Sequence, residues 1–518
     1  MPSYDTIIIG GGTNGLACAA RLAQKGAKVL VLEANTTIGG GAGSREFAPG
    51  HHVSPLAHSL HALDPRVIEG LNLERHGLAY AATNIPTTAL SAKGDHLVLE
   101  GAFGARLSGS SADTVAWAAL RQKLMTFAGV LGPFKSITPM RLAGNAGNDL
   151  IKLAKIGLKL RAIGKADFRE LLRMILINIA DVLEDDLTDD RLRGCIAFDA
   201  TLGNCLGPRS PNSLILLLNR LANEAAGQVA ALAIPKGGMA CVARAFQLAA
   251  EAEGVSIRTS SCVDRILVEN HRVRGVELGS GETIAARRII SAIHPQTTLL
   301  ALLGPRHLDT GFVRKARAIR SRGAAAKLHV ALSGTPNFRH ASLTSRLVIA
   351  PSVAAVETSF NALKYNEVPQ KPVMEILVPS AFEPGHAPSG CHTLSAVVQF
   401  APHAPKFGQR AAQMEMLANT LTVLEEHAPG ITPLISHCEL LMPQDIEATY
   451  GMIGGNWHHG ELSVEQMLFL RPVIGAAQYA APLPGLWLCS AGTHPGGGIS
   501  GASGWNAAAQ ILATEGAA

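Results

Sequence analysis

The chain has 518 residues, of which 47% are hydrophobic, 16% are charged and 4% are aromatic, and its formal net charge is +5. This length exceeds what one simple hydrophobic core accommodates, so we expect two or more domains. The composition excludes a disordered chain, and the modest charge gives no case for nucleic acid as a partner.

Cysteine usage and the first residues predict the compartment. The 8 cysteines show no CxxC or zinc-like pairing, which indicates buried thiols in a reducing environment. The first apolar strand begins almost at once, which leaves no room for a signal peptide, and no apolar run reaches the roughly 18 residues of a membrane span. We therefore expect a cytoplasmic protein, with peripheral contact to a membrane left open.

The first 34 residues carry a glycine-rich turn between two apolar runs. Residues 6–9 and 28–32 have the composition of buried parallel strands, and residues 16–25 have the apolar spacing of a helix packed on a sheet. An acidic residue, Glu33, ends the second strand. Strand, glycine turn, helix, strand and acid together form the βαβ context that the dinucleotide-binding fingerprint requires.

Each glycine of this turn has a physical reason. Gly10 permits the tight turn, Gly12 leaves room for a pyrophosphate, and Gly15 lets the helix and strand pack closely. The helix N-terminus that follows offers free N–H groups and partial positive charge to the phosphates. Glu33 is placed to hold ribose hydroxyls, and an acid there argues against the 2′-phosphate of NADP.

The α/β pattern is interrupted twice along the chain. A helical block separates the first unit from a second α/β stretch that begins at Pro235 and contains hairpin turns at residues 269–271 and 279–281. We therefore predict an α/β fold of two domains. The nucleotide-binding domain comprises residues 1–85, 230–303 and 442–518, and a mixed α+β substrate domain comprises residues 86–229 and 304–441, with a helical part at about 113–226.

A second glycine loop lies near the C-terminus. Gly496, Gly498 and Gly501 also satisfy GxGxxG, but too few residues follow for a helix, a second strand and an acid. This loop enters a helix, so it can aim N–H groups at an anionic ring such as a reduced flavin. An ordinary tight connection explains the same glycines, and the sequence leaves both interpretations open.

Several motifs resemble one flavoprotein family. "GGTNGL", the Gly39–Gly40 pair after the second strand, "SAIHP" after the hairpin and "GLWLCSAGTHPGGGISG" resemble the phytoene desaturase and carotenoid isomerase-like branch of the FAD-dependent amine-oxidase-type flavoproteins. The resemblance covers nearly the whole chain. It implies a glutathione-reductase-type Rossmann domain and a non-covalently bound FAD.

The resemblance also assigns cofactor contacts residue by residue. The implied FAD-binding residues are Gly10, Gly12, Thr13, Asn14, Gly15, Glu33, Ala34, Gly40, Gly41, Val263, Gly492, Gly498 and Ile499. The chain departs from the family at four positions. Gly41 replaces a frequent arginine, Ser490 a glycine, Gly497 a small side chain, and Trp505 a glycine or serine. These departures weaken the case for carotenoid chemistry more than the case for FAD.

Lys327 is the first catalytic candidate. It lies in the predicted strand "AAAKLHVALSG", with His329 on the same face. In amine oxidases of the superfamily a lysine in a similar strand points at the flavin through a water and assists reoxidation by oxygen, so the resemblance implies that role here. The alternative is a lysine at a strand end that reaches solvent.

Histidines supply the other candidates. His494 lies in the second glycine loop, where it either donates to the flavin or substrate or caps the turn. His459 precedes a predicted helix at 464–470, and the resemblance places this segment along the substrate cavity, where His459 would act as a base or polar anchor. His458, His459 and Glu461 invite a metal interpretation, as do four further histidines. Adjacent histidines point apart and no second ligand group is evident, so we expect no metal at either set. The four further histidines are His51, His52, His58 and His61.

One further helix carries lysines on a single face. Lys152, Lys155 and Lys159 share that face, which suits either an anionic lipid surface or ordinary solvation of a surface helix.

The sequence therefore predicts an FAD-dependent oxidoreductase that abstracts hydride from a C–C or C–N bond of a small to moderately hydrophobic substrate. Electrons then pass to an acceptor such as oxygen or a quinone. Three alternatives stay open: an amine oxidase, a flavin-dependent isomerase, and a non-catalytic prenyl- or lipid-binding protein on the same scaffold.

Overall fold

The computed structural model describes residues 4–140, 154, 157–158 and 161–515. The lysines at 152, 155 and 159 that suggested a lipid-facing helix lie outside the described residues. Within the described part, no helix combines the length and the apolar character needed to cross a membrane.

A seven-stranded sheet carries the glycine-rich turn. Strand β1 (Tyr4–Ile9) pairs in parallel with β2 (Val29–Leu32) and with β15 (Thr283–Ser291). The sheet order is β12-β2-β1-β15-β14-β13, and β21 also pairs with β15. The remaining strands are β12 (Ser256–Arg258), β13 (Val263–Glu269), β14 (Arg272–Leu278) and β21 (Leu486–Leu488). The predicted βαβ unit, hairpin turns and α/β class are confirmed.

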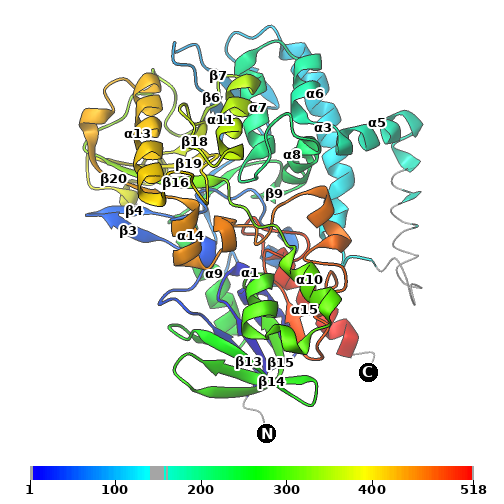
Figure 1. Ribbon diagram of the computed structural model, residues 1–518. Helices are drawn as coiled ribbons and strands as arrows, with labels where there is room; N and C mark the ends of the chain where they lie inside the picture. Colours follow the sequence, from blue (N-terminus) through cyan, green and yellow to red (C-terminus); the bar gives the residue numbers. More distant parts are fainter. Residues whose placement is uncertain (1–3, 141–153, 155–156, 159–160, 516–518) are drawn as a thin grey trace.

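Helices cover one face of this sheet. Helix α1 (Thr13–Ala23) packs between α9 (Met239–Ala252) and α15 (Ala502–Glu515). A Cβ at Gly504 would lie 1.8 Å from the carbonyl oxygen of Asn14, so glycine is what allows α15 to approach α1 this closely. In Figure 1 this layer lies at the bottom of the molecule, where both chain ends are found.

An eight-stranded sheet forms the second layer, in the order β20-β16-β19-β18-β17-β6-β7-β8. Helix α13 (Gln409–His427) packs on one face, against side chains such as Leu328 and Ile376. The opposite face carries Lys327, Val397 and Glu375 in one row, because Val397 is in register with both of the others. The strands are β6 (Thr87–Ala89), β7 (Leu97–Glu100), β8 (Arg106–Ser108), β16 (Ala325–Leu332), β17 (Arg346–Ile349), β18 (Met374–Leu377), β19 (His392–Gln399) and β20 (Ile435–Leu441).

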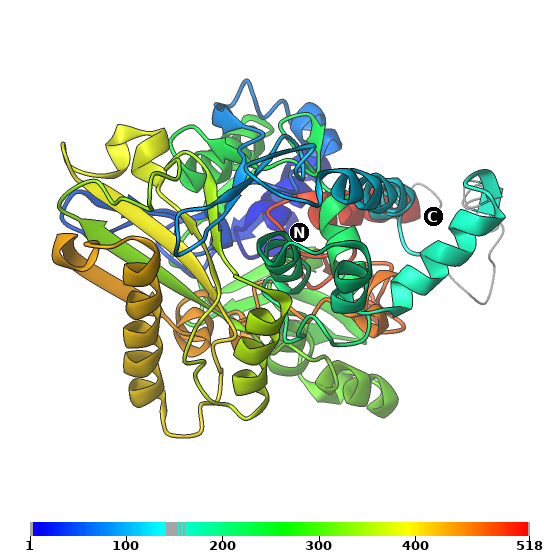
Figure 2. The ribbon, with the colours of Figure 1, turned by 90° about the horizontal axis from the view of Figure 1, so that it is seen from above.

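A helical block lies beside the second sheet, on the side of the molecule opposite α13 (Figure 2). Its described helices are α3 (Thr114–Lys135), α5 (Lys165–Leu176), α6 (Ile179–Asp186), α7 (Asp190–Thr201) and α8 (Ser213–Leu221), and α11 (Val353–Lys364) packs against α7. All strands of the two large sheets lie within the segments predicted for their respective domains. The boundaries between the domains stay a prediction.

Shorter elements connect these layers. They are α2 (Pro65–Gly70), α10 (Thr310–Arg317), α12 (Pro379–Phe382), α14 (Pro443–Tyr450), β3 (Arg45–Ala48), β4 (His51–Val53), β5 (Tyr80–Thr83), β9 (Glu224–Ala225), β10 (Gln228–Val229) and β11 (Ala233–Pro235). The prediction of a helix at 464–470 is wrong. The segment forms two single turns, Val464–Gln466 and Leu468–Leu470, separated by extended Met467. Instead of continuing a helix, the carbonyl of Gln466 accepts a hydrogen bond from the Arg471 guanidinium.

Candidate cofactor and substrate site

A cavity of about 510 Å³ runs from the β1–α1 turn to the face of the eight-stranded sheet. Most predicted site residues line it: Gly10, Gly12, Thr13, Asn14, Gly15, Glu33, Ala34, Gly40, Gly41, Val263, His459, Gly498 and Ile499. Three predicted residues, Lys327, Gly492 and His494, are not among its lining residues. The cavity thus joins segments from both ends and the middle of the chain.

The β1–α1 turn has the geometry of a phosphate cradle. Gly10 has φ +103°, which favours glycine, and a Cβ at Gly15 would lie 2.2 Å from the Gly10 carbonyl oxygen. A Cβ at Gly12 would meet nothing within 4 Å, so open space lies above this residue. No side chain caps the N-terminus of α1, so its first N–H groups are left for an anion.

The acid at the end of β2 is held by backbone groups. Glu33 Oε2 accepts a hydrogen bond from the Gly11 N–H at 2.7 Å, and Oε1 accepts one from the Asn35 N–H at 2.9 Å. The carboxylate is therefore fixed beside the glycine turn while it borders the cavity. A fixed acceptor at this end suits the hydroxyls of a ribose.

The paired glycines lie directly against this turn. Gly39 has φ +114° and donates its N–H to the Gly11 carbonyl at 2.9 Å, and a Cβ at Gly40 would lie 3.5 Å from the Gly12 Cα. Gly41 faces Ile499 across the cavity, with 3.6 Å from its would-be Cβ to the isoleucine Cδ1. The first and the last glycine loops of the chain therefore border the same space.

The C-terminal loop contributes through its second half. Gly498 (φ +130°) and Ile499 (φ +57°) line the cavity just before α15, which favours the ligand-facing interpretation of this loop over an ordinary connection. Gly492 is packed instead, since a Cβ there would lie 2.5 Å from the Pro295 ring. His494 is buried and its Nε2 lies 2.8 Å from the carbonyl oxygen of Phe134, so the structure gives it a tether to α3 and no place on the cavity wall.

Two departures from the family pattern have local explanations. A Cβ at Gly497 would lie 2.7 Å from Nδ1 of His458, so the histidine ring takes the space of the usual small side chain. The Trp505 ring packs against Gly70, whose Cβ would lie 2.3 Å from it, and the Arg21 guanidinium lies 4.0 Å from the ring centroid. Trp505 therefore joins helices away from the cavity.

His459 lines the cavity on a segment held by one buried cation. The Arg471 guanidinium donates to the carbonyls of His458, Gly460 and Ala491 at 2.5, 3.2 and 2.9 Å. Burial, together with the Arg471 charge, lowers the pKa of His459 to about 4, so its ring is neutral at neutral pH. Its Nδ1 is covered and makes no hydrogen bond, which leaves Nε2 as the nitrogen open to the cavity.

Lys327 lies inside strand β16 with only 2% of its surface exposed, so the prediction of a strand-end lysine reaching solvent is wrong. Its Nζ lies 2.7 Å from Nδ1 of His58, and Nε2 of His58 lies 3.1 Å from Oε1 of Glu375. Because a carboxylate only accepts, Nε2 donates to Glu375 and Nδ1 accepts from the lysine. Burial lowers the pKa of Lys327 to about 7, and burial and the lysine charge lower that of His58 to about 4. His58 and Glu375 line the cavity, and they connect Lys327 to it.

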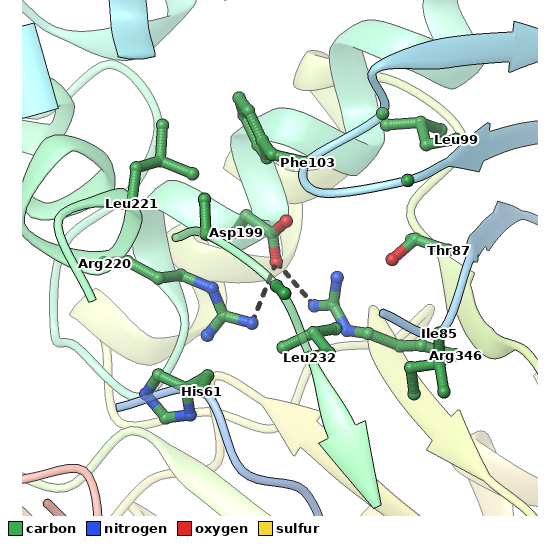
Figure 3. Close-up of a pocket in the computed structure, with 14 residues that line it drawn as sticks. His61, Ile85, Thr87, Leu99, Phe103, Asp199, Arg220, Leu221, Leu232 and Arg346 are labelled. Atoms are coloured by element: carbon green, nitrogen blue, oxygen red, sulfur yellow. Dashed lines mark hydrogen bonds and ion pairs between the residues drawn. The ribbon is translucent and has the colours of Figure 1, made fainter. Parts of the chain in front are cut away.

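From Glu375 the chain continues by hydrogen bonds through Arg346 to Asp199, which also forms an ion pair with Arg220; Figure 3 shows Asp199 between the two arginines. Arg346 donates to Glu375 at 2.6 Å and to Asp199 at 2.5 Å, and Arg220 lies 3.7 Å from Asp199. Burial alone would raise the pKa of Glu375, but Arg346 and the hydrogen bond from His58 outweigh it and hold that pKa well below its ordinary value.

The sequence interpretation missed these groups as site residues, apart from weighing His58 as a metal ligand. One signal was available: Glu375 and Lys327 are single charges inside apolar strand sequences, and Arg346 begins one. In the described part of the chain, no group of three or more His, Cys, Asp or Glu side chains is placed to hold a metal ion.

The cradle, the fixed acid and the two glycine loops define a flavoprotein of the Rossmann type, and open space above Gly12 with an uncapped helix behind it fits the diphosphate of FAD. The family model for flavin-containing amine oxidoreductases matches residues 15–512. The chain belongs to this family, and its cofactor is FAD. This finding confirms the resemblance on which the cofactor prediction rested.

Individual relatives span almost the whole chain. A rat (Rattus norvegicus) protein named pyridine nucleotide-disulfide oxidoreductase domain-containing protein 2 is 29% identical, with 98% of this chain and 93% of that protein covered. Hydroxyneurosporene desaturase of Cereibacter sphaeroides is 26% identical, with 98% and 97% covered. The solved structure of cyclohexylamine oxidase from Brevibacterium oxydans has a TM-score of 0.60 at 16% identity, with 99% and 98% covered, and shares the fold.

Proposed function

We propose that this flavin-containing oxidoreductase is a dehydrogenase of the desaturase type, which removes hydride from a carbon of a moderately hydrophobic substrate and leaves a carbon–carbon double bond. The observation that carries the proposal is the charge of the cavity wall. Of the described lining residues only Glu33 and Glu375 carry carboxylates, and both are already held by hydrogen bonds.

This charge pattern favours C–C over C–N oxidation. A protonated amine entering the cavity meets Arg220 on the wall and Lys327 behind His58, and it finds no free carboxylate on the wall to pair with. Like charges in a poorly solvated space repel strongly. Amine oxidation, the close alternative predicted from sequence, is therefore disfavoured by the wall itself.

The wall also supplies neutral bases and an apolar surface. Nε2 of His459 is open to the cavity on a neutral ring, so it is placed to accept the proton that leaves the carbon next to the hydride donor. Arg471 fixes that ring through the His458 and Gly460 carbonyls. The apolar lining that would orient the substrate and exclude water comprises Leu56, Leu202, Val397, Met452 and Trp457.

FAD, when bound, supplies the hydride acceptor. In this proposal His459 would take the proton from the substrate, and oxygen or a quinone would finally accept the two electrons that leave with the hydride. Lys327 is proposed to assist the transfer to oxygen, because a cation stabilises negative charge that develops on oxygen.

Anaerobic mixing of the purified, flavin-loaded protein with a panel of saturated and unsaturated hydrophobic compounds and of amines tests the proposal. We expect the first group to bleach the flavin absorption bands and its products to lack two hydrogen atoms. Bleaching by amines alone would favour an amine oxidase. A product of unchanged mass, formed without lasting bleaching, would show an isomerase.

His459 has its own test within the same experiment. His459→Gln should slow bleaching by roughly 10²-fold or more while flavin content stays the same. An unchanged rate in the flavin-loaded variant would remove His459 from the proton transfer.

A further inference from the structure

Arg220 has donors that make no hydrogen bond to the described residues. It lies in the last turn of α8 and borders the large cavity as well as a smaller one beside it. Within the described part of the chain, its guanidinium has one ionic partner, Asp199 at 3.7 Å, and makes no hydrogen bond. A planar guanidinium carries five N–H donors, so the Arg220 donors remain free to bind a ligand.

The one partner is already committed elsewhere. The same Asp199 Oδ1 accepts a hydrogen bond from Arg346 at 2.5 Å, which is far closer than Arg220 approaches (Figure 3). Two arginines thus share one carboxylate, while the second carboxylate of the cluster, Glu375, is taken by Arg346 and His58. The Arg220 side chain keeps 19% of its surface exposed and lines both cavities, so an incoming anion can reach its donors.

A neutral imidazole lies next to this guanidinium. His61 borders both cavities, and burial and the charge of Arg220 lower its pKa to about 3. Its ring makes no hydrogen bond to the described chain, so it keeps one donor and one acceptor for a ligand. Its Nε2 would lie 3.5 Å from a Cβ at Gly498, which places His61 between Arg220 and the C-terminal glycine loop.

The sizes of the two cavities that border Arg220 determine which of them can hold a ligand. The smaller cavity has a volume of about 30 Å³. That space holds roughly two water molecules, too few for an organic anion. The larger cavity has about 510 Å³ and an apolar wall, so an anionic group on Arg220 belongs to a ligand whose body lies in that cavity.

We propose that Arg220, with His61 beside it, binds the carboxylate of the substrate, so that the protein acts on an amphipathic monocarboxylic acid. A guanidinium pairs with a carboxylate through two parallel hydrogen bonds, which fixes orientation as well as charge. One weakly paired cation next to a neutral ring matches a monoanion better than a phosphate dianion. The inference rests on the proposed function, since it names the substrate class of the same site.

Matched acid and amide probes test this inference in the flavin-loaded protein. The probes are benzoate, phenylacetate and 4-phenylbutyrate, each compared with its uncharged amide, and binding is read from the change in the flavin absorption spectrum and from thermal unfolding. We expect at least one acid to bind tenfold or more tightly than its amide. Arg220→Gln should abolish this preference, and Arg220→Lys should restore part of it. Arg209→Gln, which changes an exposed arginine paired with Glu184, should leave the preference intact.

The outcomes separate this inference from its alternatives. Equal binding of acids and amides, no binding of any acid, or an acid preference that survives in Arg220→Gln would overturn it. Loss of the preference in Lys327→Met with its retention in Arg220→Gln would assign the anion to Lys327. Loss of flavin from Arg220→Gln would assign Arg220 to the cofactor. A protein that retains FAD but fails these tests leaves the oxidoreductase proposal standing, whereas a protein that binds no FAD removes both.

Discussion

Lys327 and His58 are joined by a hydrogen bond of 2.7 Å, although 269 residues of chain separate them. The lysine is buried in a strand of the second sheet, and the histidine lies on a loop that borders the cavity. Burial lowers the pKa of Lys327 to about 7, so the charge at this position changes within the physiological pH range.

Lys327→Met should slow reoxidation of the reduced flavin by oxygen by roughly a hundredfold, because it removes a cation that stabilises developing negative charge. The protonated lysine exists below its pKa, so the wild-type rate should fall as pH rises through about 7, and the variant should lack this fall. Stopped-flow reoxidation across pH measures both effects.

Lys371→Met is the matched control, since Lys371 is exposed and pairs with Glu426 at the surface. It should change neither the rate nor its pH profile. If Lys327→Met also leaves both unchanged while flavin content is normal, the lysine serves only to position His58.

Gly12→Val should produce a folded protein that cannot retain FAD. A Cβ at Gly12 meets no protein atom within 4 Å, so the valine occupies the open space in which we place the diphosphate. Gly129→Val is the matched control, because a Cβ there also meets nothing within 4 Å and the residue lies at an exposed position of helix α3. Flavin content after gel filtration, with circular dichroism as the check on folding, measures the effect. Full flavin retention in Gly12→Val would contradict this placement of the phosphates.

Gly15→Val should instead destabilise the folded protein. Its Cβ would lie 2.2 Å from the backbone oxygen of Gly10, and neither backbone segment can yield easily. We expect loss of flavin accompanied by a lower unfolding temperature, whereas Gly12→Val loses flavin alone.

The sequence predicts the βαβ unit at the cofactor end of the site because the signals of that unit are local. Gly10, Gly12, Gly15 and Glu33 lie within one βαβ unit, where the spacing of glycines and apolar residues determines the backbone path. The predicted helix at 464–470 failed because the long-range hydrogen bonds of Arg471 outweigh helical propensity.

The substrate end of the site was not predictable in this way. Lys327, Glu375 and Arg346 come from three strands, and only the register of the eight-stranded sheet brings them to one face with His58. Each appears in the sequence as one charge within or at the start of an apolar run, a pattern that indicates a buried group but does not identify its partner. The glycine at position 497 is likewise explained only by the structure, which places the His458 ring against it.

Gly497→Ala should disturb the cavity wall, because its new methyl group would lie 2.7 Å from Nδ1 of His458 and 3.2 Å from that residue's Cα. Overpacking of this kind costs about 1–3 kcal/mol of unfolding free energy. His458→Ser in the same chain should recover a large part of that cost, since it removes the ring. A double-mutant cycle by urea unfolding measures the coupling. If the effects of the two substitutions on the unfolding free energy are additive, the His458 ring is not the reason that position 497 requires glycine.

Arg346→Met should be among the most destabilising single substitutions, because it leaves both Asp199 and Glu375 buried without their closest cation. Breaking a buried ion pair in this way costs about 3–5 kcal/mol at neutral pH. Arg265→Met breaks an exposed pair with Glu277 and should cost less than about 1 kcal/mol. Urea unfolding of both variants measures the difference.

The pH dependence of this cost has a definite sign. Arg346 and His58 hold the pKa of Glu375 below its ordinary value in the folded protein, so the stabilisation is present above the ordinary carboxylate pKa and is lost as pH falls. The gap in unfolding free energy between wild type and Arg346→Met should therefore narrow as pH falls below about 4, the ordinary pKa of a carboxylate. Glu375→Gln, added to Arg346→Met, should recover part of the loss at neutral pH. A gap that stays constant with pH would mean that lost packing of the arginine side chain, rather than an unpaired buried carboxylate, causes the destabilisation.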